Sequence, residues 1–346
     1  MAAVTTTSRG TELRPIAWRK MAWSTWRLHR IALCGVLALF GVGAIWLTIR
    51  GLQMHHAYAA VAACRPIGSG FCRGVADQFL NSYVPGVGPT LGILQVFPAL
   101  VGAFVGVPVL ARELETGTFR YAWTQGFGRT RWTVAKLAPL AIAFTVAAGA
   151  FSMLVSWYVQ PIWAAGDDNG PLYPTIFDLR GVALAAWTLA AFAIGVLAGF
   201  LIKRVTPAMF ATFATWSGLA FLTGAFLRGH YESPLVSTNP NFNIRSWVIS
   251  QVWSEGGKPA SLSMINQTLQ AIDVRASTPG QFQPGPATPS TVDPVHYLVQ
   301  HGYALVTTYQ PDSRFWSFQL VEGSWLVVLS VAILGSAVWL VRRRAT

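Results

Sequence analysis

Six stretches of this sequence are apolar along their whole length and contain no Asp, Glu, Lys or Arg. A helix needs about 20 predominantly apolar residues to cross the hydrocarbon core of a bilayer, and each stretch is long enough. Core helices of soluble proteins rarely run so far without a charge, so the pattern predicts six transmembrane helices. These spans are 31–49, 91–111, 137–159, 181–202, 205–227 and 324–341.

The composition agrees with a membrane protein and excludes an ordinary soluble one. Of the 346 residues, 53% are hydrophobic and only 11% are charged, although the net charge is +12. A soluble domain carries about 25% charged residues. A basic protein that binds nucleic acid presents many more Lys and Arg on its surface. We therefore expect the lipid bilayer as the environment and no nucleic acid as a partner.

The charges divide unevenly between the segments that connect the spans, and Lys and Arg favour the cytoplasmic side. With the N-terminus inside, the inside segments hold 16 basic and three acidic residues, which gives +13. The outside segments hold nine basic and ten acidic residues, which gives −1. Both termini are therefore predicted to be cytoplasmic, in the plasma membrane. The inside segments are 1–30, 112–136, 203–204 and 342–346.

The first span has an alternative interpretation as a secretory signal peptide. Arg27 and Arg30 precede it, and Ala57-Tyr58-Ala59 resembles a cleavage site. However, signal peptides have an apolar region of about 7–15 residues, which is shorter than this run. The small-residue triplet also lies far beyond the end of the run, so a retained span is favoured.

Two cysteines on the predicted outer side are close in sequence. Cys64 and Cys72 lie in the connection 50–90, with Gly68 and Gly70 between them. Thiols oxidise outside the cytoplasm, and a short glycine-containing loop brings two cysteines within bonding reach. We predict a disulfide, and the alternative is a pair of free thiols.

The connection 228–323 is predicted to form a small extracellular cap. Residues 277–294 are rich in Pro and Gly, which excludes a helix interior. The segments 244–253 and 295–308 have the apolar spacing of short helices. His296 and His301 are five residues apart, a spacing that does not suit a helical metal pair, so no metal site is predicted.

Residues 14–30 form a basic, aromatic helix candidate on the inner side. Its basic side chains lie on one side of a helical wheel, opposite Ala17, Met21 and Leu28. Such a helix lies along a membrane surface with its Trp side chains at headgroup depth. It either anchors the first span or touches a cytoplasmic partner, and the sequence leaves both interpretations open.

The inner loop 112–136 carries more chemistry than a turn requires. Its sequence, RELETGTFRYAWTQGFGRTRWTVAK, places two Glu and five basic residues around Trp123 and Trp132. Aromatic and Arg anchors carry much of the binding energy of protein interfaces. Glycines on each side of Phe119–Gln125 would delimit a short helix across the membrane surface, and the loop is therefore a candidate docking site.

This loop resembles that of the membrane subunit of type-2 ABC exporters, with its Glu-x-Gly-Thr run, paired Arg and a Lys that opens the third span. The AWTQ and RTRW runs, and YQPDSRFWSFQ at 309–319, look like a permease subfamily common in actinobacteria. With the six spans and cytoplasmic termini, the resemblance extends over the whole chain. The residues that match are Glu115, Gly117, Thr118, Thr124, Gln125, Arg129, Arg131 and Lys136.

The resemblance implies that two membrane subunits pair, as two copies or paralogues, and that each docks on an ATP-binding subunit. The loop 112–136 would be the coupling helix and 14–30 the connecting helix at the same interface. The implied coupling residues are Glu113, Glu115, Gly117, Thr118, Trp123, Gln125, Arg129 and Arg131. The implied connecting-helix residues are Arg19, Lys20, Trp23 and Arg27.

The predicted fold is an all-α integral membrane protein. Its parts are a cytoplasmic N-terminus (1–30), spans 1–5 with the coupling loop (31–227), an extracellular loop domain (228–323), and span 6 with a basic tail (324–346). The chain has no G-x-x-x-x-G-K-[ST] motif, so ATP and Mg are expected on the partner subunit and no cofactor on this chain. The six stretches contain no Asp, Glu, Lys, Arg or His, which disfavours a proton-driven transporter.

In similar exporters spans 2 and 5 face the substrate route, which would lie between the two membrane subunits. The aromatic residues that these spans would offer are Phe97, Phe104, Phe210, Phe213 and Trp216. An aromatic, uncharged lining suits a hydrophobic or amphipathic substrate, whereas the alternative is that these rings face lipid or the core. The spacings Gly102–Gly106 and Gly195–Gly199 allow close helix contact, more readily within one subunit than between two.

Two other classes of function compete with the permease. A membrane-embedded enzyme that acts on lipid or glycan precursors would need carboxylates at the membrane surface. Asp167, Asp168 and Asp178 are the candidates in a short outer loop, although a turn and a helix start are the more natural interpretation of them. The third class is a structural or sensory membrane protein that transports nothing.

Overall fold

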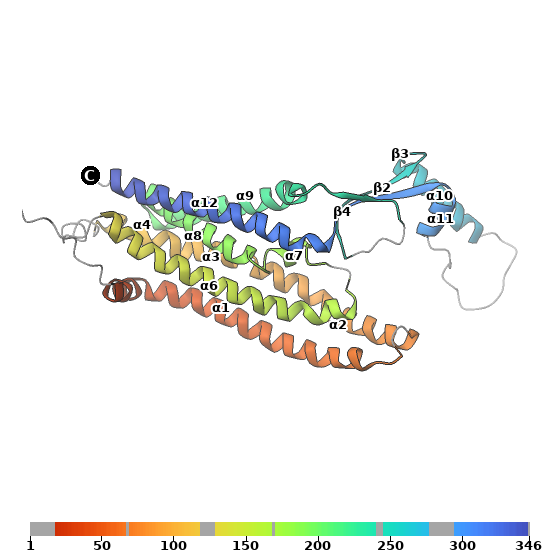
Figure 1. Cartoon of the computed structure of the whole chain (residues 1–346), viewed down its shortest axis with the longest axis horizontal. Coiled ribbons are helices and arrows are strands. Elements are labelled where there is room, and N and C mark those ends of the chain that lie inside the picture. Colours follow the sequence, from red (N-terminus) through yellow and green to blue (C-terminus); the bar gives the residue numbers. More distant parts are fainter. Residues whose placement is uncertain are drawn as a thin grey trace, which may run out of the picture.

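The computed structural model describes residues 18–66, 69–117, 129–167, 170–239, 245–276 and 294–344. Long helices form an elongated bundle that carries a small β-sheet at one end (Figure 1). The C-terminus and the start of the first helix lie at the opposite end. These are called the sheet end and the terminal end below.

Six helical segments are long and apolar enough to cross a membrane, which confirms the predicted number of spans. They are Cys34–Ala63, Gly70–Thr116, Thr130–Ala165, Ala183–Ile202, Val205–His230 and Asp312–Arg343. The principal helices that form them are α1 (Trp18–Ala63), α2 (Gly70–Leu94), α6 (Arg129–Ala165), α8 (Ala183–Ile202), α9 (Val205–Leu222) and α12 (Phe315–Arg344). The chain is therefore a mainly helical, multi-pass membrane protein.

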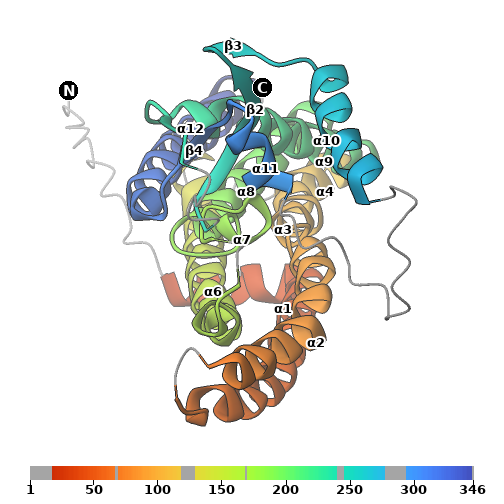
Figure 2. The same ribbon diagram turned by 90° about the vertical axis from the view of Figure 1, so that its right-hand side faces the viewer.

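The first helix joins two elements that were predicted separately. Residues 18–30 of the predicted connecting helix and the whole predicted span 31–49 belong to the single 46-residue helix α1. Its first turns, dark red in Figures 1 and 2, cross the terminal end of the bundle at a steep angle to the rest of α1. The side chains of Arg19, Lys20, Trp23 and Arg27 lie outside the described part of the chain.

The connection between the first two spans is a helical hairpin, which corrects the predicted loop over 50–90. α1 continues to Ala63 and α2 begins at Gly70. The chain stays helical because Phe79 of α2 packs against Tyr58 of α1, with ring centroids 5.9 Å apart. Cys64 and Cys72 form a disulfide at the tip, with their Cα atoms 5.6 Å apart.

Span 4, the helix α8, is the centre of the bundle. It is apolar on all sides, and most of its residues are buried against α6, α9 and α12. A helix without a polar face belongs in the interior of a bundle. The second half of span 2 also packs on α8. That half consists of α3 (Phe97–Val101), the π-helical turn η1 (Gly102–Gly106) and α4 (Val107–Thr116).

Glycines allow spans 2 and 4 to approach backbone to backbone. A Cβ atom added to Gly102 would lie 2.4 Å from the Ala191 carbonyl oxygen, and one added to Gly195 would lie 2.1 Å from the Gly102 oxygen. Small residues permit such contacts between membrane helices. The two glycine spacings therefore serve packing within one subunit, which was the favoured interpretation.

The connection between α9 and α12 contains a four-stranded antiparallel sheet in the order β1-β4-β2-β3. Its strands are β1 (Leu235–Ser237), β2 (Trp247–Glu255), β3 (Lys258–Pro259) and β4 (Tyr303–Gln310). The helices α10 (Leu262–Ala276) and α11 (Pro294–Gln300) lie beside it (Figure 1). The remaining short elements are α7 (Pro174–Phe177), η2 (Thr223–Leu227), η3 (Arg228–His230) and η4 (Asp312–Arg314).

The sheet corrects two predicted helices of the cap, while the chain as a whole is mainly helical, as predicted. Residues 244–253 were predicted as a helix, but β2 begins at Trp247 and pairs with β4 along its length. Residues 295–308 are helical only as far as Gln300, because Gly302 turns the chain at φ +86° before β4. Both segments are rich in β-branched and aromatic side chains, which fit a paired strand.

Replacement of Gly195 by Ala is expected to destabilise the protein by about 1–3 kcal/mol, because the added methyl group would overlap the Gly102 backbone. Gly218→Ala is the matched control, since a Cβ atom there has no neighbour within 4 Å. The control should be neutral or stabilising by up to about 1 kcal/mol through helix propensity. Thermal unfolding of the detergent-purified variants measures both changes, and equal behaviour would contradict the close helix contact.

Candidate functional site

The terminal end of the bundle holds an ion pair between the two helices that border the predicted coupling loop. The Lys136 ammonium of α6 pairs with the Glu113 carboxylate of α4 and donates to the Val109 carbonyl oxygen at 3.1 Å. It also lies 4.8 Å from the centre of the Trp132 ring. Because Lys136 is only 3% exposed, the pair is shielded from water and fixes α4 against α6.

Glu115 connects the same end of α4 to span 5. Its Oε2 atom accepts a hydrogen bond from the Val205 backbone N–H at 3.4 Å. Val205 is the first residue of α9, and the preceding Arg204 makes no side-chain cap. A carboxylate at a helix N-terminus satisfies a free N–H and interacts favourably with the helix dipole. The start of the coupling loop is thereby bonded to the start of α9.

The other predicted coupling residues are described in part. Gly117 ends α4 in the left-handed conformation, at φ +71°, where glycine is favoured. Arg131 is exposed on the first turn of α6. The side chain of Arg129 and the residues Thr118, Trp123 and Gln125 lie outside the described part of the chain.

Replacement of Lys136 by Met should destabilise the protein by about 3–5 kcal/mol, because Glu113 would stay buried without a counter-charge. The double variant Glu113→Gln/Lys136→Met should recover most of this loss. Thermal unfolding in detergent measures the stability of each variant in this double-mutant comparison. Arg131→Met is the control on the same helix, with an expected change within about 0.5 kcal/mol. An unchanged transition in Lys136→Met would contradict a buried ion pair.

A second ionic cluster lies at the sheet end and is centred on Arg228. Its guanidinium donates through Nε and Nη2 to the two carboxylate oxygens of Glu322, at 2.9 and 2.8 Å. Nη2 also pairs with Asp178. Arg228 and Glu322 are almost completely buried, and the guanidinium lies 4.3 Å from the centre of the Phe177 ring. Bidentate pairing of this kind fixes geometry as well as charge.

Neutral donors complete the environment of Glu322. The Trp187 indole of α8 donates to Oε1 at 2.8 Å, and the Tyr231 hydroxyl donates to Oε2 at 3.2 Å. The Trp325 indole in turn donates to the Tyr231 hydroxyl at 3.1 Å. The buried carboxylate of α12 is therefore surrounded by donors from α8 and from the segment after η3, which lowers the cost of burying its charge.

Gln319 fixes the start of the central helix one turn before Glu322. Its side-chain oxygen accepts hydrogen bonds from the backbone N–H groups of Val182 and Ala183, at 2.9 and 2.8 Å. Its side-chain amide donates to the Phe177 carbonyl at 3.0 Å. Helix N-termini have unpaired N–H groups, and α12 supplies the acceptor here for α8.

The Asp178 carboxyl has an unusual acidity in this cluster. Burial raises the pKa of Asp178 to about 6, although Arg228 lowers it, and nearby Glu322 raises it further. Burial also raises the pKa of Tyr231 above its ordinary range. The charge of the cluster consequently changes near pH 6, whereas an exposed aspartate is ionised at that pH.

The sequence-based prediction did not identify this cluster. Arg228 follows the predicted fifth span directly, and Glu322 precedes the sixth by two residues, so both were assigned to the outer connection. Asp178 was interpreted as a helix start or as a surface carboxylate of an enzyme. In the structure it forms an ion pair with Arg228. The feature of the sequence that could have indicated the cluster is the spacing of Gln319 and Glu322. This spacing puts two polar side chains on one face of an otherwise apolar helix.

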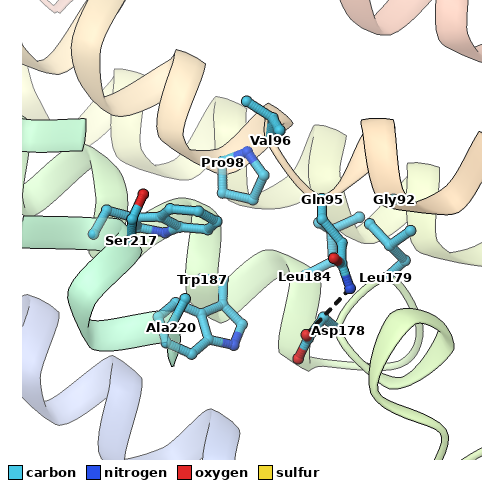
Figure 3. Close-up of a pocket in the computed structure, with 11 residues that line it drawn as sticks. Gly92, Gln95, Val96, Pro98, Asp178, Leu179, Leu184, Trp187, Ser217 and Ala220 are labelled. Atoms are coloured by element: carbon cyan, nitrogen blue, oxygen red, sulfur yellow. Dashed lines mark hydrogen bonds between the residues drawn. The ribbon is translucent and has the colours of Figure 1, made fainter. Parts of the chain in front are cut away.

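A cavity of about 250 Å³ lies beside the cluster. Figure 3 shows Val96 and Pro98 on one side of it, with Trp187 and Ala220 opposite. Its polar boundary is formed by Gln95 and Asp178, whose side chains are joined by a 3.4 Å hydrogen bond. The complete lining is Gly92, Gln95, Val96, Pro98, Asp178, Leu179, Leu184, Trp187, Trp216, Ser217 and Ala220.

The aromatic residues proposed for a substrate route take different positions. Trp216 lines the cavity, whereas Phe97 is buried in the bundle core beside Phe40 and Phe151. Phe97 therefore belongs to the alternative interpretation of a core aromatic. Phe104 and Phe210 are exposed on the surface of the bundle, and Phe213 is half-buried.

Six apolar helices, one of which is the buried central helix α8, define a multi-pass membrane protein, and the ionic clusters of its described residues lie at the two ends of the bundle. The model of the ABC-2 membrane transporter related family matches residues 37–228, and the chain belongs to this family. The match begins in span 1 and ends at Arg228. Neither the curated proteins nor the solved structures contain a match. Family membership gives the chain a permease role in an ABC transporter, a system that includes an ATPase partner.

Proposed function

We propose that this chain is the permease subunit of an ATP-driven exporter and that a separate ATPase subunit docks at its terminal end. The observation that carries this proposal is the contact between Glu115 and Val205 at the border of the coupling loop. Through this hydrogen bond, a movement of the loop would be transmitted directly to span 5. The partner holds ATP and Mg, and this chain contributes the transmembrane route.

The orientation of the chain follows from its charge. The segments assigned to the cytoplasm hold 16 of the 25 Lys and Arg residues. Basic segments remain on the cytoplasmic side of a plasma membrane, where ATP is present. We infer that the terminal end and both termini face the cytoplasm. The disulfide between Cys64 and Cys72 supports an oxidising outer side for the sheet end.

The coupling loop is fixed at both of its borders, as a transmitting element requires. The ion pair between Glu113 and Lys136 joins α4 and α6 at the two borders of the loop. Glu115 adds the third helix, α9. A movement of the docked ATPase would therefore displace the ends of three helices together. The first turns of α1, which carry Arg19, Lys20, Trp23 and Arg27, cross the same end and would contact the partner as the connecting helix.

A second membrane subunit is proposed to cover spans 2 and 5. α9 contributes few buried residues, and Phe210 on it is 73% exposed. Phe104 of span 2 is also exposed. A pairing of these faces would enclose a route for a hydrophobic or amphipathic substrate between two copies or paralogues.

The charge reversal Arg131→Glu and the truncation Glu115→Ala should each reduce ATP-dependent transport about tenfold or more, as loss of an interface anchor does. The complex is isolated from native membranes and reconstituted in liposomes. Co-isolation of the ATPase subunit and its ATPase activity are measured beside transport. Membrane insertion should be unchanged, because Arg131 and Glu115 are exposed.

Two variants on the sheet serve as matched controls for this experiment. Glu255→Ala and Lys258→Glu make a matching truncation and charge reversal at the exposed ends of β2 and β3, on either side of the turn that joins them. Both should transport at the rate of the unmodified protein. Full transport by the Arg131 and Glu115 variants would remove the coupling role from this loop. A chain that never co-isolates with an ATPase would overturn the proposed function itself.

A further inference from the structure

The cavity at the sheet end has an aromatic wall formed by two helices. Trp187 of α8 and Trp216 of α9 meet edge to face, with ring centroids 5.9 Å apart, and both line the cavity. Pro98 and Leu184 add apolar surface (Figure 3). Aromatic faces attract organic cations such as quaternary ammonium groups, most strongly where water is excluded.

The polar boundary of the cavity carries a net negative charge. Asp178 lines it, and Arg228 and Glu322 lie directly behind Asp178. Two ionised carboxylates and one guanidinium sum to −1. An uncompensated charge in a low-dielectric interior is costly, so a monovalent cation in the cavity would neutralise the cluster favourably. An anion of the same size would be repelled.

The Trp216 indole gives a further indication of the chemistry that the cavity would recognise. Its buried Nε1 atom has no hydrogen-bond partner among the described residues. Buried polar atoms are paired in the great majority of cases, with protein groups, water or ligands. A cation that also carries an oxygen atom would supply an acceptor for this donor.

The position and size of the cavity restrict the ligand further. Val96 of the turn between α2 and α3 and Ser217 of α9 are exposed, so the lining reaches the bundle surface at spans 2 and 5. The volume of about 250 Å³ lies just below the ~300–1,000 Å³ of pockets that enclose drug-sized ligands. A cationic head with a small ring fits this space, and longer apolar groups would extend toward the exposed edge.

We propose that this cavity binds the head of a lipophilic organic cation and that the transported substrate belongs to this chemical class. The inference rests on the proposed function, because it names the substrate of the same permease. The bound cation lies against the Trp187 and Trp216 rings and beside the Asp178 carboxylate. Its apolar part follows the face that spans 2 and 5 share.

Binding should depend on pH through Asp178, whose pKa is raised to about 6 by burial. The charged or titratable groups that face it are Arg228 and Glu322, with Tyr231 bonded to Glu322. Above pH 6 the Asp178 carboxylate is ionised and the cluster carries −1. Below pH 6 the carboxyl is protonated and the cluster is neutral, so affinity for the cation should fall as the pH decreases through 6.

Equilibrium dialysis of radiolabelled benzyltrimethylammonium against the purified full-length chain, without an ATPase, tests the proposal. Its uncharged carbon isostere, neopentylbenzene, and the anion benzenesulfonate serve as competitors of similar size. The cation should bind saturably, and neither competitor should displace it at equal concentration. Displacement by neopentylbenzene as effective as displacement by the unlabelled cation would overturn the cation selectivity.

Two variants distinguish the contribution of the charge to cation binding from that of the aromatic wall. Asp178→Asn leaves Arg228 paired with Glu322 and makes the cluster neutral, so it should weaken cation binding about tenfold and abolish the pH dependence. Trp216→Leu should also weaken it about tenfold and keep the pH dependence. Asp77→Asn on α2 and Trp339→Leu on α12 are exposed controls that should bind normally.

The outcomes distinguish this proposal from the permease role. Binding within twofold of the unmodified protein in both Asp178→Asn and Trp216→Leu would overturn the cavity as the cation site. That result, together with normal ATPase coupling, would leave the proposed function intact. A chain that never co-isolates with an ATPase, yet shows normal, Asp178-dependent cation binding, would overturn the proposed function and retain the site.

Discussion

The burial of Arg228 is the constraint on which the sheet end depends. Removing a guanidinium from water costs several kcal/mol, and only well-placed carboxylates offset that cost. The two carboxylates come from the turn after α7 and from α12, while Arg228 itself follows the helix α9–η2. Three segments distant in sequence are therefore fixed at one point. Gln319 and Trp187 extend the same arrangement to the central helix α8.

One helix connects the two ends of the bundle. The first backbone N–H of α9 is bonded by Glu115 at the terminal end, and its Trp216 lines the cavity at the sheet end. The helical turns that follow α9 carry Arg228. Between the ends, glycines pack span 2 tightly on α8, backbone against backbone. In the proposed function, α9 is the element through which ATPase docking and substrate binding affect each other.

The sequence was sufficient for the six spans, because apolar runs of this length without a charge are rare outside membranes. It also predicted the Cys64–Cys72 pair from spacing and from the predicted outer side. It was insufficient where a segment's structure depends on distant partners: β2 forms because β4 pairs with it, and the α1–α2 hairpin is stabilised by the packing of Phe79 on Tyr58. The cluster of Arg228 escaped prediction for the same reason. Its members are separated by 50 and 94 positions, and only the fold brings them together.

The sheet has no flexible connection to the sixth span. β4 ends at Gln310, and after Pro311 the turn η4 continues directly into α12. A tilt at the start of α12 would therefore be passed to β4 at Gln310. A strand of eight residues is about 26 Å long, so a tilt of α12 by roughly 10° would swing its far end by roughly 4–5 Å. Small rearrangements among the spans would thus cause larger displacements at the far end of the sheet.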